Sequence, residues 1–370
     1  MSKIRSKKNL FFKRGFFLLN ISKKFRLFLS YKIKKVVNLK IQLKEIEFKK
    51  NLFKKNNLKI LFKKINNKEY SNISCKEFYT SYLQTASYIE SYSKKYLFYK
   101  LLFKNNIIGK FAISIKKYLG INFYIINRIS LEEYYISNKE ISYEYIYYKL
   151  IIFLKNNLDS GLLIILPLNN VNSFSPIFDK FIKILKIRPY VTGLIKLNQS
   201  IEDIKINMKS RWRRQIKNGE KLNYGIVISD KKKDINSVIN IYKNEKNYDG
   251  LNTKVLEKWY LKSKNKEIKF ISITAYKNVR GENKAVGFLL FCIQESTSTY
   301  LLGVFKNKSE NKYVSNILLW NSIIYSKKYG CNYFDLGGID TLKTPGIAHF
   351  KLGLNPIIHK DSELKFIFIR

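Results

Sequence analysis

The second half of the chain switches between blocks with helical spacing of apolar residues and short runs that alternate apolar and polar positions. A helix is predicted to begin at Ile201, because Ser200 precedes it as a cap and Asp203 occupies the third position of a capping box. Further helices are predicted over 208–222, 234–247, 254–264 and 313–329, and strands over 225–229, 269–276, 285–293, 299–305, 333–336 and 364–369. This order predicts an α/β domain in which three consecutive strands form a meander.

The first half repeats this rhythm with a weaker pattern. Residues 96–103 and 107–115 have strand spacing and are joined by the polar tripeptide 104–106, which predicts a β-hairpin. The remaining elements predicted here are helices over 78–92, 143–156 and 178–185 and strands over 161–166 and 190–197. We therefore predict three parts: a basic N-terminal extension (1–66), a first, degenerate domain (67–200) and a second domain (201–370).

The chain carries 70 Lys and Arg against 27 Asp and Glu, a formal net charge of +43. Such a charge normally recruits a polyanion. However, ten of these residues are Arg and the rest are Lys, and Lys, Asn, Ile, Tyr and Phe, whose codons are rich in A and T, dominate throughout. Nucleotide bias therefore explains much of the charge. Residues that need G or C in their codons stand out against it: three Arg lie within 211–214, and five of the sixteen Gly lie within 330–353.

The N-terminal segment is the most basic part of the chain. Residues 1–68 hold 22 Lys and Arg and two Glu. Apolar residues between Leu10 and Phe28 interleave with these charges, so the segment could form a basic amphipathic helix at an anionic membrane, contact RNA, or be a loosely ordered extension. A strand is predicted over 37–43, where apolar and polar residues alternate.

The cysteines and the apolar runs indicate the cellular compartment in which the protein is expected. Cys75, Cys292 and Cys331 are odd in number and lack metal-ligand spacing, so neither a metal site nor a disulfide framework is predicted. The longest uncharged run, 160–178, is interrupted by Asn and Pro and is not expected to span a membrane. No secretion signal is evident at the N-terminus. We expect a cytoplasmic protein, with peripheral attachment to the inner face of the membrane as an open alternative.

Several blocks of the second half follow one another in a recognisable order. A Thr-bearing strand, a short acidic helix and an Arg-rich helix come first; the blocks are 192–197, 200–203, 208–217, 248–250, 318–320, 333–340 and 346–353. Their order resembles that of the Fem family, the aminoacyl-tRNA-dependent peptidyltransferases that build peptidoglycan cross-bridges, and the similarity extends from about Phe78 to Leu354. The resemblance implies an α/β (α+β) fold of two tandem GNAT-like acyltransferase domains, whose sheet splays at its middle to admit an acyl donor.

The Arg-rich helix is a candidate phosphate-binding element. Arg211 and Arg214 lie three residues apart on one helical face, and Lys217 extends that face. Two guanidinium groups so placed suit bidentate capture of phosphate oxygens. The resemblance implies a phosphate-bearing acceptor, either a nucleotide-linked muropeptide or its lipid-pyrophosphate form. The alternative is a solvated basic face, and Trp212 is predicted to be a core residue.

A Gly-rich turn follows the strand 333–336. Asp335, Gly337 and Gly338 end this strand, and Gly there allows positive φ or a close approach of backbone to ligand. Asp340 could orient an amine or cap the next segment. Tyr300, in the strand 299–305, is placed with these residues as a further substrate-binding candidate.

Phe350 and Lys351 match the pair that the Fem family uses at the acyl end of the tRNA. Aminolysis of an ester passes through a tetrahedral oxyanion, and an ammonium fixed within about 3 Å stabilises it. The resemblance therefore implies that Lys351 is the catalytic residue and that Phe350 holds it. His349 could act as a base or be a surface residue; otherwise proton transfer is expected to be substrate-assisted. No cofactor is expected, because aminoacyl-tRNA is the co-substrate.

Departures from the family and other classes of function stay open. Residues 353–356 read Gly-Leu-Asn-Pro where the family often has Gly-Phe-Gly-Gly, and the long helical hairpin that some members use for tRNA is missing. A CoA-dependent acyltransferase should carry a Gly-rich pyrophosphate loop, whereas 304–312 contains no Gly. The alternatives are a Fem-like acyltransferase acting on a polysaccharide or lipid, and a non-catalytic RNA-binding protein.

Overall fold

The computed structural model describes residues 59–74, 81–131, 141, 143–166, 190–244, 251–263, 268–306, 309–360 and 365–369. The strand predicted over 37–43, the helix predicted over 178–185 and the block 248–250 lie outside these residues. None of the helices in the described ranges combines the length and the apolar character that crossing a bilayer requires.

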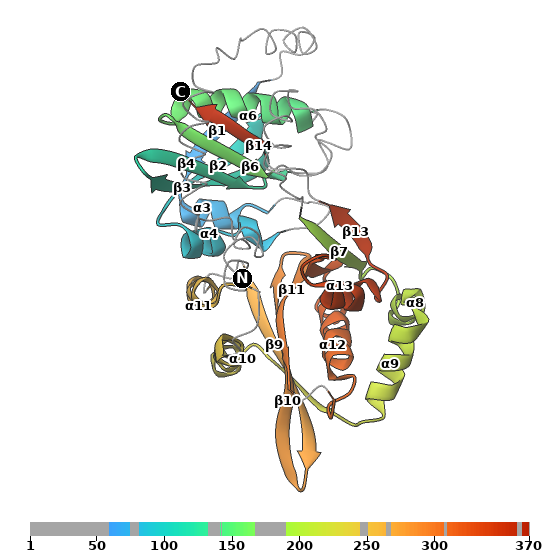
Figure 1. The fold of residues 1–370 in the computed structure, drawn as a ribbon. Coiled ribbons are helices and arrows are strands. Elements are labelled where there is room, and N and C mark those ends of the chain that lie inside the picture. The colour runs from blue at the N-terminus through green and yellow to red at the C-terminus, as the bar shows by residue number, and fades with distance from the viewer. Residues whose placement is uncertain are drawn as a thin grey trace, which may run out of the picture. The chain divides into compact units, whose positions relative to one another are not determined.

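The first half forms a seven-stranded sheet (Figure 1). The strands follow the order β1-β2-β3-β4-β6-β14, and β5 pairs with β3. Their bounds are β1 Ile60–Ile65, β2 Lys95–Phe103, β3 Asn106–Tyr118, β4 Ile121–Asn127, β5 Ser130–Leu131, β6 Gly161–Leu166 and β14 Lys365–Ile369. The helices are α3 Asn67–Asn72, the 3-10 turn Tyr82–Gln84, α4 Ala86–Tyr92 and α6 Tyr143–Asn157. The predicted hairpin is confirmed: β2 and β3 pair across a tight turn in which Lys104 and Asn105 have positive φ.

The second half forms another seven-stranded sheet, in the order β13-β7-β12-β11-β10-β9-β8. Its strands are β7 Val191–Lys196, β8 Gly225–Ser229, β9 Lys269–Val279, β10 Glu282–Gln294, β11 Thr297–Phe305, β12 Tyr333–Gly338 and β13 Ile357–Lys360. Its helices are α8 Ile201–Asn207, α9 Ser210–Glu220, α10 Lys232–Asn244, α11 Thr253–Lys262, α12 Val314–Lys328 and α13 Pro345–Leu352. The predicted cap of α8 is confirmed, because Ser200 Oγ accepts a hydrogen bond from the backbone N–H of Asp203 at 2.9 Å.

Both sheets follow the same plan. Antiparallel strands lead to one parallel pair that is joined through a crossover helix, namely β4 and β6 through α6 in the first sheet and β11 and β12 through α12 in the second. One further antiparallel strand then follows the parallel pair, β14 beside β6 and β7 beside β12. The predicted fold of two tandem GNAT-like domains is confirmed by this repeated topology.

Each sheet contains one strand from beyond the predicted domain boundary at residue 200. β7 precedes this predicted domain boundary but belongs to the second sheet, whereas β14 is C-terminal to it and belongs to the first. β1 likewise falls inside the segment 1–66 that was expected to be an extension. Cuts at residues 66 and 200 therefore do not separate the two sheets, because strand pairing joins residues that are distant along the chain.

The core of the second half lies between its sheet and two helices. Figure 1 shows α9 and α12 on one face of this sheet and α10 on the other. The buried cluster between the sheet, α9 and α12 includes Trp212, Ile216, Phe291, Leu318 and Phe334. Full burial of each apolar side chain contributes about 1.5–3 kcal/mol. This packing ties α9 to the end of β12, where the candidate site lies.

Candidate active site

The second sheet opens between β11 and β12. These parallel strands pair through three residues only, and the last pair is Thr299 with Asp335. Both strands are irregular just beyond this point. In β11 the register against β10 shifts, because Leu290 and Phe291 of β10 pair with Leu302 and Tyr300. In β12 the register against β7 shifts between Asp335 and Gly338. Such bulges bend strands and end their pairing. The splayed sheet implied by the sequence resemblance is therefore present.

A buried carboxylate fixes the backbone of this bulge. Asp335 Oδ1 accepts a hydrogen bond from the N–H of Gly337 at 2.8 Å and another from the hydroxyl of Thr192 on β7. The Thr192 hydroxyl also lies 2.9 Å from the Gly337 carbonyl oxygen. Gly337 has φ +67°, a conformation that glycine adopts without strain. Burial raises the pKa of Asp335, opposed by these hydrogen bonds and by the charges of Arg128 and Lys351.

Lys351 points its ammonium group at the same turn. It lies in the last turn of α13, and 2% of the residue is exposed. Its Nζ donates a hydrogen bond to the Gly338 carbonyl oxygen at 2.9 Å and lies 5.2 Å from the centre of the Tyr300 ring. A Cβ added to Gly337 would lie 3.8 Å from this Nζ and 3.0 Å from the Tyr300 carbonyl oxygen. The structure thus brings five predicted site residues together: Lys351, Asp335, Gly337, Gly338 and Tyr300.

The helix that carries Lys351 is held by Trp212 of α9. Trp212 Nε1 donates a hydrogen bond to the Phe350 carbonyl oxygen at 2.7 Å, and the two rings lie 5.0 Å apart. The Lys209 N–H donates to the Gly353 carbonyl oxygen at 3.0 Å. A Cβ on Gly353 would lie 2.1 Å from Trp212 Cδ1, so only glycine fits under the indole. Trp212 is a core residue, as predicted, and its packing against Phe350 positions the turn beside Lys351.

The three predicted phosphate-binding residues do not join this cluster. Arg211, Arg214 and Lys217 are exposed, whereas α9 buries Trp212, Ile216 and Gly219. At about 100° per residue, Arg214 and Lys217 lie on the helical face opposite that buried stripe, and Arg211 lies at the side of the stripe. Their shared face was predicted correctly, but it is turned away from the core. Arg213 has a different role, because its Nη1 donates to the carbonyl oxygens of Ile206 at 2.7 Å and Met208 at 2.6 Å, at the end of α8.

Asp340 caps the turn before α13. Its Oδ1 accepts hydrogen bonds from the backbone N–H groups of Leu342 at 3.0 Å and Lys343 at 2.9 Å. Of the two roles considered for it, these contacts match the cap. His349 lies in the last turn of α13 and is exposed.

Arg128, which directly follows β4 in the first half, was not predicted as a site residue. It is 3% exposed, has φ +75° and acts electrostatically on Asp335. A left-handed backbone at a residue other than glycine costs on the order of 1 kcal/mol, so the surrounding packing must impose it. One signal was available: Arg is rare in this Lys-rich chain, and this one follows directly after a buried strand.

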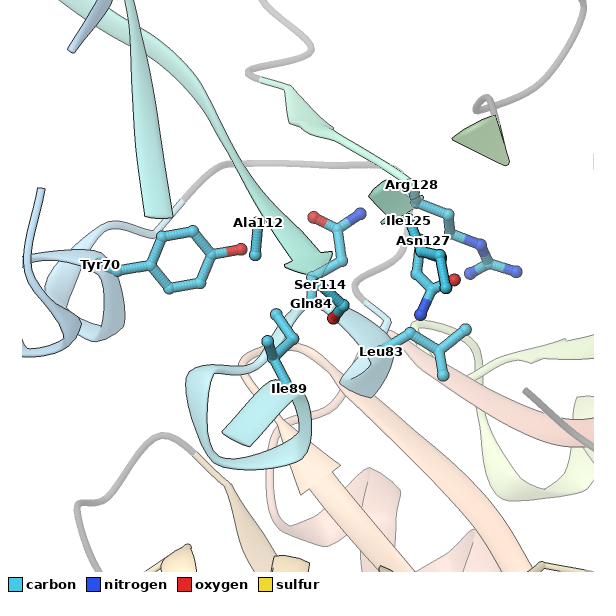
Figure 2. Close-up of a pocket in the computed structure, with 9 residues that line it drawn as sticks. All are labelled: Tyr70, Leu83, Gln84, Ile89, Ala112, Ser114, Ile125, Asn127 and Arg128. Atoms are coloured by element: carbon cyan, nitrogen blue, oxygen red, sulfur yellow. The ribbon is translucent and has the colours of Figure 1, made fainter. Parts of the chain in front are cut away.

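Arg128 also lines a small polar cavity in the first half. Figure 2 shows Tyr70 and Arg128 at opposite sides of it, with Gln84 and Ser114 between them. The cavity has room for about one water molecule. It is therefore too small to hold a ligand much larger than water.

The fold is similar to those of several solved structures. No protein-family profile and no curated protein sequence matches the chain. Among solved structures, FemX has a TM-score of 0.64 at 13% identity, covering 83% of this chain and 97% of FemX. A tandem GNAT protein from the clavulanic acid biosynthesis pathway has a TM-score of 0.47 at 7% identity, covering 84% of this chain and 99% of that protein. The C-terminal domain of a putative lysylphosphatidylglycerol synthetase from Agrobacterium fabrum has a TM-score of 0.41 at 12% identity, covering 71% and 81%.

The repeated topology and the open sheet define a tandem GNAT-like fold. Within this class, the similarity to FemX over nearly all of that structure shows a Fem-like GNAT fold.

Proposed function

We propose that this protein is an acyltransferase that moves an amino acid from aminoacyl-tRNA to an amine of a peptidoglycan precursor. The observation that supports this proposal is the buried ammonium of Lys351, held against the Gly338 carbonyl where β11 and β12 separate. A lysine buried to this degree is rare unless its charge has a use or a partner. The Fem-like order of the sequence blocks supports aminoacyl-tRNA as the donor and a peptidoglycan precursor as the acceptor.

The reaction is aminolysis of an ester. The acceptor amine attacks the aminoacyl carbonyl carbon, and a C–N bond forms as the C–O bond to the tRNA ribose breaks. One proton leaves the amine and one reaches the ribose oxygen, so the ribose hydroxyl is regenerated. The carbonyl oxygen carries negative charge in the tetrahedral intermediate, and the Lys351 ammonium stabilises that charge. Its bond to Gly338 and its contact with the Tyr300 ring keep it in place before the substrate arrives.

Asp335 supports this arrangement in two ways. Its hydrogen bonds with Thr192 and Gly337 fix the turn whose next carbonyl, that of Gly338, receives the Lys351 hydrogen bond. Its carboxylate, when ionised, also attracts the Lys351 ammonium. Aminoacyl-tRNA is preferred over an acyl-CoA donor, because residues 304–312 lack the glycines of a pyrophosphate-binding loop.

The test is transfer by the purified full chain. Aminoacylated tRNA and a nucleotide-linked muropeptide are supplied, and the products are analysed by mass spectrometry. We expect a muropeptide extended by the aminoacyl residue, a loss of about 100-fold or more in rate for Lys351→Met, and no loss for the exposed Lys360→Met. No product with any charged tRNA would contradict the proposal, whereas product on a lipid or polysaccharide amine alone would change the acceptor class.

A further inference from the structure

Helix α9 and its C-cap carry a row of basic side chains outside the buried stripe of the helix. Arg211, Arg214, Lys217 and Lys221 are all exposed, and we call this row the α9 ridge. Among the described residues, no carboxylate forms an ion pair with any of the four; the neighbouring Glu220 pairs with Lys205 instead. The ridge follows the helix axis for about 15 Å. Four cations beside one carboxylate, which is itself paired with Lys205, present a net positive potential to an anionic partner.

The arginines of this region divide between two tasks. Arg213 forms intramolecular contacts, because its two hydrogen bonds go to backbone carbonyl groups at the end of α8. Among the described residues, none receives a hydrogen bond or forms an ion pair with Arg211 or Arg214; both side chains are exposed, Arg214 opposite the buried stripe of the helix and Arg211 at its side. Their guanidinium groups therefore remain available for bidentate contacts with phosphate oxygens.

The inner face of the same helix packs against the candidate active site. Trp212 bonds to the Phe350 carbonyl and covers Gly353, at the turn that carries Lys351. Near the other end, a Cβ on Gly219 would lie 2.6 Å from the side chain of Ile317, so α9 also packs tightly on α12. A molecule bound along the ridge is thus held at a fixed position relative to Lys351.

We propose that the α9 ridge docks the phosphate backbone of the tRNA donor, and this proposal rests on the function proposed above. A single pyrophosphate would reach only part of a ridge of this length, whereas one strand of a nucleic acid presents a phosphate about every 3.4 Å of duplex axis. A membrane-binding helix places apolar side chains beside its basic ones. The apolar side chains of α9, Trp212 and Ile216, are buried instead. Charge and shape therefore favour RNA over a lipid surface or a lone pyrophosphate.

The test measures RNA binding without catalysis. The full-length protein is titrated against fluorescently labelled, uncharged tRNA at several salt concentrations. We expect the double variant Arg211→Gln/Arg214→Gln to bind about tenfold or more weakly at low salt, and the slope of log affinity against log salt to fall by about 1.4. The matched control Lys232→Gln/Lys233→Gln removes the same charge from exposed positions of α10 and should change both far less.

Three results overturn the inference. If the ridge and control variants lose RNA affinity equally, net charge alone is responsible. If tRNA affinity is unchanged while KM for the muropeptide rises, the ridge binds the acceptor phosphates. If tRNA affinity is unchanged while binding to vesicles containing phosphatidylglycerol is lost, the ridge binds membrane. Failure of the proposed function is a separate result, because a protein that transfers no amino acid still gives a measurable tRNA affinity and salt slope.

Discussion

Replacing Gly353 by Ala probes the contact that positions the turn beside Lys351. The added methyl carbon would lie 2.1 Å from Trp212 Cδ1 and 2.6 Å from Nε1, well inside van der Waals contact. The indole or the turn must move, and the 2.7 Å bond between Trp212 Nε1 and the Phe350 carbonyl is then lost or lengthened. Overpacking costs about 1–3 kcal/mol and a lost hydrogen bond about 0.5–1.5 kcal/mol. We expect the free energy of unfolding to fall by about 2–4 kcal/mol.

The assay is urea unfolding followed by fluorescence, with Gly346→Ala as the matched control. Gly346 lies in the first turn of the same helix and has open space around its Cα, so alanine there should be neutral or gain up to about 1 kcal/mol from helix propensity. In a Trp212→Leu background the Gly353→Ala cost should shrink by about 1 kcal/mol or more, because the clash is gone. Equal stability of the two alanine variants, or additive costs in the double variant, would refute the packing argument.

Three further changes test the site and its surroundings. Thr192→Val removes a buried hydroxyl that Asp335 and Gly337 share, and should cost about 1–3 kcal/mol in urea unfolding; an unchanged midpoint would contradict the hydrogen bonding seen here. Because the pKa of Asp335 is raised on folding, its contribution to stability is present below its ordinary pKa of 3.8 and is lost as pH rises through the folded value. Asp335→Asn should therefore gain stability relative to the wild type as pH rises above about 4, and parallel pH profiles would show that burial does not raise this pKa. Arg213→Gln should lower stability by about 1 kcal/mol and leave the tRNA salt slope nearly unchanged, whereas a drop in slope like that of the Arg211/Arg214 variant would place Arg213 on the ridge.

Most elements of the fold were predicted from local patterns of residues. The cap at Ser200, the hairpin turn at Lys104 and the buried strand of β6 depend on neighbouring residues, and all three were predicted. The partners of β7 and β14 were not predicted, because alternation of apolar residues marks a strand without saying which strand it pairs with. The exchange of strands across residue 200 is therefore visible only in three dimensions.

The helix that carries Lys351 shows a different limit. Pro345, Gly346 and Gly353 suggest a loop when they are counted as helix breakers, and no helix was predicted there. In the structure Pro345 occupies the first turn and Gly353 the C-cap of α13, positions where both residues are compatible with a helix. The motif thus identified Lys351 as a candidate, but its burial and its bond to Gly338 required the folded chain.

For the basic helix α9, the common face of Arg211 and Arg214 was predicted, but the direction in which this face points was not. Spacing of three residues placed Arg211 and Arg214 on a common face correctly. Which way that face points depends on the burial of Trp212 and Ile216 against elements far along the chain. Sequence spacing alone could not separate a site beside Lys351 from an outward ridge.

The central claim is that the Lys351 ammonium stabilises the oxyanion of acyl transfer. It is tested most directly by the single-turnover rate of amino acid transfer with excess enzyme, measured beside the tRNA dissociation constant for the same preparation. We predict that Lys351→Met lowers this rate by about 100-fold or more while the tRNA dissociation constant changes by less than about threefold. Transfer by the Lys351→Met variant at the wild-type rate would show that this ammonium does not stabilise the oxyanion.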